Sequence, residues 1–235
     1  GLSSTQVPGL TTAQLAAWST SAQIRALESA DLAQLSSAQV KSLSSAQLGY
    51  LSSAQLAALS GAATGVLGTN TIASLNSADL AALTSAQVAG LSTAQLQALS
   101  STQVPGLGTE DIAALSSVQI GALRTASLAG LDTDQIAALS STNVKGLSSA
   151  QLLALSSSQI AALETDDFAQ LSSAQLGALS SKQGAGLTTA QLASLDSAEL
   201  SKLSTAAVQG LSTAAIAGLS STQVPGLTTA QLAAW

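Results

Sequence analysis

The sequence predicts an all-α protein, a solenoid of very short capped helices with one helix in every eight residues. Leucine recurs at every eighth position from Leu27 to Leu227 without a break. The unit reads L-[ST]-[ST]-A-Q-[LVI]-A-[AG]; we call it an octad and number its positions one to eight from the leucine. One long helix is excluded, because at about 100° per residue its leucine row would circle the helix. A β-solenoid fits poorly, because strands keep one face at even spacings, whereas positions one and six are five apart.

Each octad carries the signals that start a helix. Ser or Thr at position two and Gln at position five have the spacing of a capping box, in which each side chain binds a backbone N–H that the helix leaves free. Ser36 and Gln39 are one such pair. Leu35 and Val40 flank them at the spacing of a hydrophobic staple. Because position three is also Ser or Thr nearly throughout, the sequence leaves open a cap one residue later.

The charged residues support the same helix direction. All twelve acidic residues occupy positions two, four or five, near the predicted helix start, and four of the six basic residues occupy positions seven or eight. This distribution suits the helix dipole. Glycine recurs at position eight, as in Gly90, Gly130, Gly146 and Gly210, where the sequence predicts a left-handed helix C-cap.

A helix of about five to seven residues is unstable alone, so neighbouring octads must stack. We expect leucine at position one, the aliphatic residue at position six and alanine at positions four and seven to form a narrow core. Ser, Thr and Gln are expected to face solvent. Trp18 and Trp235 take the place of leucine in phase and are expected to lie in the core.

A few octads depart from the pattern. Thr64 and Gly184 replace the aliphatic residue at position six, where we expect bends or soft spots. Proline stands at position seven in three copies of SSTQVPG and predicts an early helix end there; these prolines are Pro8, Pro105 and Pro225.

The domain organisation follows from the repeat. We expect residues 1–235 to form a single continuous octapeptide-repeat array. Residues 1–18 and 218–235 are identical, GLSSTQVPGLTTAQLAAW. Such identity within a drifted array suggests a duplication at a longer period, so we expect the chain to be a segment of a longer tandem protein.

Composition excludes several functions. Charged residues are 8%, the net charge is −6 and the basic residues are scattered, so we expect no nucleic-acid partner. Polar residues interrupt every apolar run well before the roughly 20 residues of a membrane span. The absence of His and Cys removes the common catalytic triads and most transition-metal sites. We therefore expect no enzyme activity, no cofactor, and no catalytic, cofactor-binding or metal-binding residue.

Three groups of residues could suggest a site, but each has a simpler structural explanation. Ser180 and Ser181 next to Lys182 could suggest Ser–Lys chemistry, but they fit ordinary caps better. Acidic groups could suggest calcium, but acids at helix starts explain them; these groups are Asp132–Asp134, Glu110–Asp111 and Thr165–Asp167. The regular hydroxyls could order water or ice, but capping already accounts for them.

Several stretches of the array resemble the repeats of a known kind of protein. Residues 187–195 read LTTAQLASL, residues 131–139 read LDTDQIAAL and residues 171–179 read LSSAQLGAL. They resemble the octapeptide-repeat regions of giant bacterial surface or secreted adhesin-like proteins, the so-called haem-utilisation or adhesion proteins. The resemblance implies an extracellular or cell-surface location. Haem itself is a poor fit, because Tyr50 is the one residue of the usual axial-ligand types.

The sequence therefore favours a structural extracellular repeat protein, a fibre, stalk or adhesin spacer that acts through length and self-association. The expected partners are further copies of the chain, joined head to tail or laterally, and components of the cell surface. The alternative is a solenoid binding scaffold that encloses a groove or tube for a peptide or an apolar ligand.

Overall fold

A computed structural model describes residues 4–234, and every regular element in this range is a helix, which confirms the all-α prediction. The chain groups into two compact units, Gly1–Leu115 and Ser116–Trp235, and each is described by itself. That residues 1–235 form one continuous array remains a prediction.

The first unit contains short α-helices and two 3₁₀-helices. They are η1 (Val7–Gly9), α1 (Thr12–Ala16), α2 (Ser21–Arg25), α3 (Ser29–Leu32), α4 (Ser37–Lys41), α5 (Ser45–Leu48), α6 (Ser53–Ala57), α7 (Gly61–Thr64), α8 (Thr69–Ser74), α9 (Ser77–Ala81), α10 (Ser85–Ala89), α11 (Thr93–Ala98), η2 (Val104–Gly106) and α12 (Thr109–Ala114).

The second unit continues the same succession of short helices, one in each octad. They are α13 (Ser117–Ala122), α14 (Thr125–Leu128), α15 (Thr133–Ala137), η3 (Val144–Gly146), α16 (Ser149–Ala154), α17 (Ser157–Ala162), α18 (Thr165–Phe168), α19 (Ser173–Ala178), α20 (Ser181–Gly184), α21 (Thr189–Ser194), α22 (Ser197–Leu200), α23 (Thr205–Gly210), α24 (Thr213–Ala217), η4 (Val224–Gly226) and α25 (Thr229–Leu232).

The capping box is present as predicted, with the cap at position two. In α4, the backbone N–H of Gln39 donates to the Ser36 hydroxyl at 3.3 Å, and the N–H of Ser36 donates to Gln39 Oε1 at 2.8 Å. The same reciprocal pair begins most of the α-helices, which settles the ambiguity between positions two and three. Each helix is then followed by a residue with an extended backbone, which is either the next leucine or the next cap residue.

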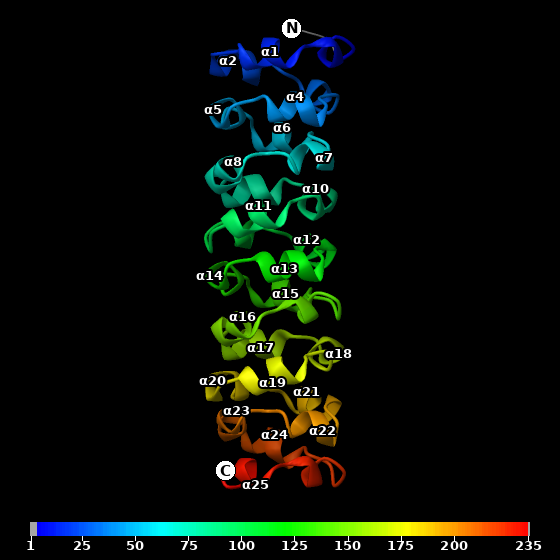
Figure 1. The fold of residues 1–235 in the computed structure, drawn as a ribbon, viewed down its shortest axis with the longest axis vertical. Coiled ribbons are helices and arrows are strands. Elements are labelled where there is room, and N and C mark those ends of the chain that lie inside the picture. Colours follow the sequence, from blue (N-terminus) through cyan, green and yellow to red (C-terminus); the bar gives the residue numbers. More distant parts are fainter. Residues whose placement is uncertain (1–3, 235) are drawn as a thin grey trace. The chain divides into compact units, whose positions relative to one another are not determined.

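Helices stack at an interval of three octads. In the first unit, α4 packs on α7 and α7 on α10, while α5 packs on α8 and α8 on α11; Figure 1 shows these two rows along different sides of that unit. In the second unit, α17 packs on α20 and α20 on α23. One turn of each solenoid therefore takes three octads, with one helix on each of its three sides.

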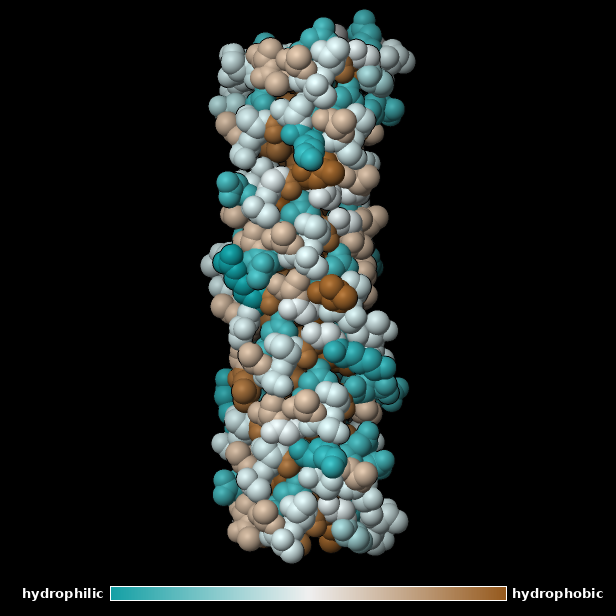
Figure 2. Space-filling model, in the orientation of Figure 1, coloured by the Kyte–Doolittle hydropathy of each residue, from teal (hydrophilic) through white to brown (hydrophobic). Residues whose placement is uncertain are grey.

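The interior of each unit is filled by positions one and six, as expected. The position-one leucines from Leu27 to Leu211 are 0–8% exposed, and Phe168 at position six is fully buried. Ala38 and Ala150 at position four are exposed, so the predicted alanine contribution to the core is wrong at that position. Because most large apolar side chains are inside, the face seen in Figure 2 is mostly pale and teal, with small brown hydrophobic patches. Trp18 is half-buried, whereas Trp235 lies outside the described residues.

The expectation that glutamine faces solvent is also wrong. Gln87, Gln95, Gln151 and Gln191 at position five are only 1–2% exposed. Burial of an amide is costly unless its hydrogen bonds are satisfied. The position-five amides therefore need hydrogen-bond partners inside the stack of turns.

The predicted left-handed glycine caps are absent from residues 4–234, where no residue has a positive φ. Glycine is needed at position eight for a different reason. A Cβ on Gly106 would collide with the backbone of Ser77, and one on Gly146 with the backbone of Ser117. In each case the glycine allows its turn to approach position three of the octad that lies three octads earlier in the chain.

The irregular octads keep their place in the stack. Around Pro105 a 3₁₀-helix, Val104–Gly106, replaces the α-helix, in keeping with the expected early end. The octad of Lys145 has the same 3₁₀-helix without proline, so proline is not required for it. Thr64 is fully buried, and its hydroxyl donates to the Ser60 carbonyl at 3.1 Å. At Gly184 the missing side chain is replaced by close approach of the Ala207 backbone.

Candidate functional site

The glutamine at position five links each turn to the turn before it. Its Oε1 accepts the N–H of the cap within its own octad, which leaves the Nε2 amide directed toward the preceding turn. Gln95 shows the arrangement: Nε2 donates to the Leu67 carbonyl at 2.9 Å and to the Thr64 carbonyl at 3.0 Å. One side chain therefore caps its own helix and joins two turns.

This bond recurs along both units with nearly constant geometry. The acceptor is the carbonyl of the position-one residue in the octad that lies three octads earlier. The distance from Nε2 to this carbonyl oxygen is 2.6–2.9 Å. The pairs with this constant separation are Gln55–Leu27, Gln87–Leu59, Gln95–Leu67, Gln103–Leu75, Gln151–Leu123, Gln159–Leu131, Gln175–Leu147, Gln183–Leu155, Gln191–Leu163, Gln223–Leu195 and Gln231–Leu203. We call this series of bonds the glutamine ladder.

The one irregularity in the leucine spacing tests the ladder. An extra residue lies between Trp18 and Leu27. The bonds that cross it have a sequence separation of 29, against 28 elsewhere: Gln39 Nε2 donates to Leu10 at 2.9 Å, and Gln47 Nε2 donates to Trp18 at 2.7 Å. The ladder thus follows the octads and not the residue count.

At two position-five aspartates, Asp79 and Asp167, the direction of the contact between turns is reversed. The Ser53 hydroxyl donates to the Asp79 carboxylate at 2.7 Å, and the Ser141 hydroxyl donates to the Asp167 carboxylate at 2.7 Å. Each serine occupies position three of the octad that lies three octads before the octad of its aspartate. A carboxylate only accepts, so it takes the neighbouring hydroxyl where glutamine takes a carbonyl.

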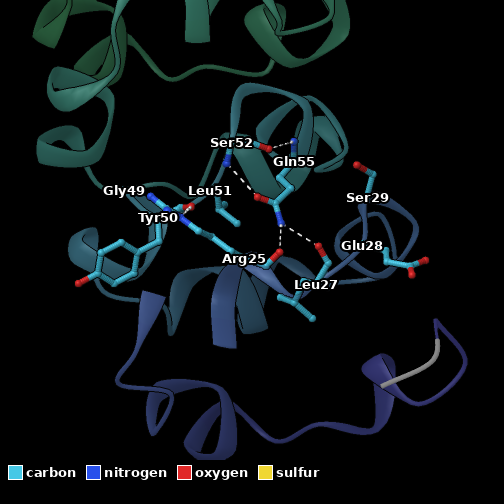
Figure 3. Close-up of a pocket in the computed structure, with 9 residues that line it drawn as sticks. All are labelled: Arg25, Leu27, Glu28, Ser29, Gly49, Tyr50, Leu51, Ser52 and Gln55. Atoms are coloured by element: carbon cyan, nitrogen blue, oxygen red, sulfur yellow. Dashed lines mark hydrogen bonds between the residues drawn. The ribbon is translucent and has the colours of Figure 1, made fainter. Parts of the chain in front are cut away.

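Shallow crevices lie where consecutive turns meet. One has a volume of about 590 Å³ and lies between the octads of Leu27 and Leu51. Figure 3 shows Gln55 at its back, with Nε2 directed to the Leu27 carbonyl, while Tyr50 and Glu28 lie toward the outside. Arg25 Nε donates to the Tyr50 carbonyl at 3.4 Å.

Equivalent crevices recur elsewhere in the first unit. One lies between the octads of Leu83 and Leu107, and another between those of Leu43 and Leu67. All three have the same place in the repeat, beside helix starts of octads three apart. They are a product of stacking, and their lining changes with each octad, so none has the features of a dedicated ligand pocket.

The acidic groups considered for calcium take part in helix starts. Asp132 Oδ1 accepts the N–H of Gln135 at 2.8 Å, and Asp111 Oδ2 accepts the N–H of Gly108 at 2.8 Å. Asp167 takes the Ser141 hydroxyl. Between residues 4 and 234, no three acidic side chains gather in a way that could hold a metal ion. Ser180, considered for Ser–Lys chemistry, donates its hydroxyl to Gln183 Oε1.

Sequence reasoning found the capping role of glutamine and missed its second role. A signal was available: a capping box accepts Glu as well as Gln, yet Glu199 is the single glutamate at position five. Only the amide has an N–H to donate. The preference for Gln over Glu therefore indicates a required donor as well as a cap.

The fold and the ladder define a class of protein, an all-α solenoid of tandem repeats. The chain belongs to the ALTTAQ repeat family, whose model matches residues 24–61, 72–109, 105–141, 136–165, 160–197 and 192–234. No curated protein matches the chain. Within residues 4–234, none of the helices has the length and apolar character required to cross a bilayer.

Proposed function

We propose that this protein is a structural element of the cell surface or the extracellular space, a fibre, stalk or adhesin spacer. It acts through length and self-association and catalyses no reaction. The resemblance of its octads to those of giant adhesin-like proteins supports this location and role.

The observation that carries the proposal is the double use of each octad's polar residues. Glutamine at position five caps its own helix and joins the preceding turn, and Ser or Thr at position two completes the cap. The apolar residues at positions one and six fill the interior of each unit. With these side chains committed to stacking, each added octad contributes mainly length and surface.

The alternative, a scaffold that encloses a peptide or an apolar ligand, has less support. Such a scaffold needs a lined groove or tube, whereas buried leucines occupy the inside of each unit. The outer crevices are shallow and repeat with the octads. They offer contact along a surface but no enclosed chamber.

Two experiments test the proposal. Electron microscopy and small-angle scattering of the purified chain should show elongated particles or fibres; compact round particles would contradict a spacer role. Antibody labelling of intact producing cells, compared with lysed cells, should detect the protein without lysis. Labelling that depends on lysis would contradict the surface location while leaving the spacer role to the first experiment.

A further inference from the structure

Glutamine is missing from position five over one complete turn in each unit. Three consecutive octads of the first unit have Ala63, Thr71 and Asp79 there, and three of the second unit have Glu199, Ala207 and Ala215. At every other place in the array, an octad without this glutamine lies between two octads that have it. Because a turn takes three octads, each run removes the glutamine ladder from all three sides of one junction between turns.

We call these two junctions the seams. The first seam joins residues 35–58 to residues 59–82 in the first unit, and the second seam joins residues 171–194 to residues 195–218 in the second unit. Each seam therefore lies inside a unit, with turns joined by the ladder before and after it.

Hydroxyl groups make the side-chain bonds across the first seam. Thr71 Oγ1 donates to Ser45 Oγ at 3.3 Å, and Ser53 Oγ donates to the Asp79 carboxylate at 2.7 Å. Ala63, on the third side, has no side-chain donor. A crevice of about 270 Å³ lies beside Thr71, which is shorter than the glutamine of other octads. Two hydroxyl bonds thus stand where the ladder would place three amide groups.

The second seam keeps a close contact on one of its three sides. There Ser204 Oγ donates to the Leu179 carbonyl, and α23 packs on α20. On the other two sides Glu199 and Ala215 have no side-chain N–H to donate. This seam is therefore attached mainly along one side, as a hinge is.

A second irregularity of the array falls at the same two places. The two octads without an apolar side chain at position six are those of Thr64 and Gly184. Thr64 belongs to the turn that follows the first seam, and Gly184 belongs to the turn that precedes the second. Burial of apolar surface is the main attraction between packed elements. Each seam therefore has less apolar side chain to bury as well as no amide bond from position five.

We propose that the two seams are yielding joints, at which consecutive turns separate before the other turns of their unit. In a stacked array, stability is approximately a sum over repeats and the interfaces between neighbours, so the weakest interface opens first. The turns beside the first seam stay joined to their other neighbours by ladder bonds from Gln39, Gln47, Gln55, Gln87, Gln95 and Gln103.

Opening at a seam lets a unit bend or lengthen while the ladder-joined turns on either side stay folded. The use of such a joint, as the extensible part of a spacer, rests on the proposed function. The order in which the junctions open does not rest on it, because that order follows from the contacts alone.

The test compares wild type with a variant whose first seam regains the ladder. Thr71→Gln/Asp79→Gln supplies two amide donors to position-one carbonyls of the preceding turn. The matched control, Thr69→Gln/Glu110→Gln, adds two glutamines and removes one negative charge at exposed positions outside the ladder. The opposite variant, Gln87→Ala/Gln95→Ala/Gln103→Ala, creates a new seam between residues 59–82 and residues 83–106.

Hydrogen exchange of the full chain reports the opening, because helices this short depend on neighbouring turns for their stability. In wild type the amides of α4–α9, beside the first seam, should be about tenfold less protected than those of residues 83–106. The amides of α19–α24 should likewise be less protected than those of α16–α18. Thr71→Gln/Asp79→Gln should raise the protection of α4–α9 by about tenfold, and the control should leave it unchanged. The opposite variant should lower the protection of residues 83–106.

Optical tweezers applied to the two ends of the chain test the joints under load, where the opening rate decides the order of events. Wild type should first yield in short steps at low force. Thr71→Gln/Asp79→Gln should lose one of these steps, whereas the control should keep them all.

Three outcomes would overturn the inference: equal protection at the seams and in the reference turns, a ladder-restored variant no better protected than its control, or early steps that both share. Elongated particles with equal protection throughout would remove the joints but leave the spacer role. Compact round particles with weakly protected seams would contradict the spacer role but leave the order of opening. The failure of the joints and the failure of the proposed function can thus be told apart.

Discussion

The hydroxyl of Ser204 donates a hydrogen bond to the carbonyl oxygen of Leu179, the position-one acceptor that a glutamine amide occupies elsewhere in the ladder. In this octad Ala207 replaces the glutamine at position five that would otherwise reach Leu179. Ala207 has no side-chain donor, and its backbone closes on Gly184. The closer approach brings the cap hydroxyl within reach of the carbonyl, so a shorter side chain satisfies the same acceptor.

Ser204→Ala should therefore cost more than the loss of an ordinary cap. Ser204 Oγ also accepts the N–H of Ala207 at 2.9 Å, so the variant loses a cap and a bond between turns. Ser212 is a matched control, since it caps an octad that also has alanine at position five, accepting the N–H of Ala215 at 3.1 Å. Urea unfolding should show Ser204→Ala less stable than Ser212→Ala by about 1 kcal/mol. Equal losses would mean that the bond to Leu179 contributes nothing.

Gln95→Ala should destabilise its part of the array by about 2–3 kcal/mol, because it leaves a buried carbonyl without a donor and a small void. Gln97→Ala is the control, since Gln97 is exposed and close by in the same octad. Because stacked repeats need not unfold together, hydrogen exchange of the amides near Leu67 should be measured along with chemical unfolding. Unchanged protection there would contradict a role for the ladder.

Gln95→Glu should make stability depend on pH. The introduced carboxyl would face the carbonyls of Leu67 and Thr64, which disfavour its charged form, so its pKa in the folded state should rise above the ordinary glutamate value. For a group with a raised pKa, stability is highest below the unfolded-state value and falls as pH rises through the folded-state value. Thermal unfolding from acid to neutral pH should show this fall relative to wild type. A constant difference would exclude the predicted carbonyl contact.

Gly106→Ala should be destabilising and Gly9→Ala should not. Both glycines end the same VPG sequence, and neither has a positive φ. A Cβ on Gly106 meets the backbone of Ser77, whereas a Cβ on Gly9 meets nothing within 4 Å. Overpacking predicts a loss of about 1–3 kcal/mol for Gly106→Ala, and reduced chain entropy predicts a small gain for Gly9→Ala. Equal melting temperatures would remove close packing as the reason for this glycine.

Asp79→Gln should stabilise the first unit by about 1 kcal/mol. The substitution restores the consensus residue, whose Nε2 would reach the carbonyl of Leu51, the position-one acceptor three octads earlier, while its Oε1 keeps the cap on Asn76. The bond from the Ser53 hydroxyl to the carboxylate is lost in exchange. Calorimetry of the two proteins makes the comparison, and Asp79→Asn, with a shorter amide, is the control that should not gain stability.

The local structure could be predicted from the sequence because its causes lie within a single octad. Ser36 and Gln39 are close neighbours in the chain, so their capping box needs no knowledge of the rest of it, and it fixes where the helix begins. The leucine spacing fixes one helix per octad. Charges at the helix ends follow the same local rule, and the structure confirms that position two is the cap in α4.

The contacts between turns were decided only by the tertiary structure. Three octads per turn is a property of how helices pack, and it alone brings the Leu67 carbonyl to the amide of Gln95. It also brings the backbone of Ser77 against Gly106, which is why that residue is glycine although its φ is ordinary. A sequence read octad by octad places a polar amide in solvent, because the acceptor that makes its burial favourable lies three octads earlier in the chain.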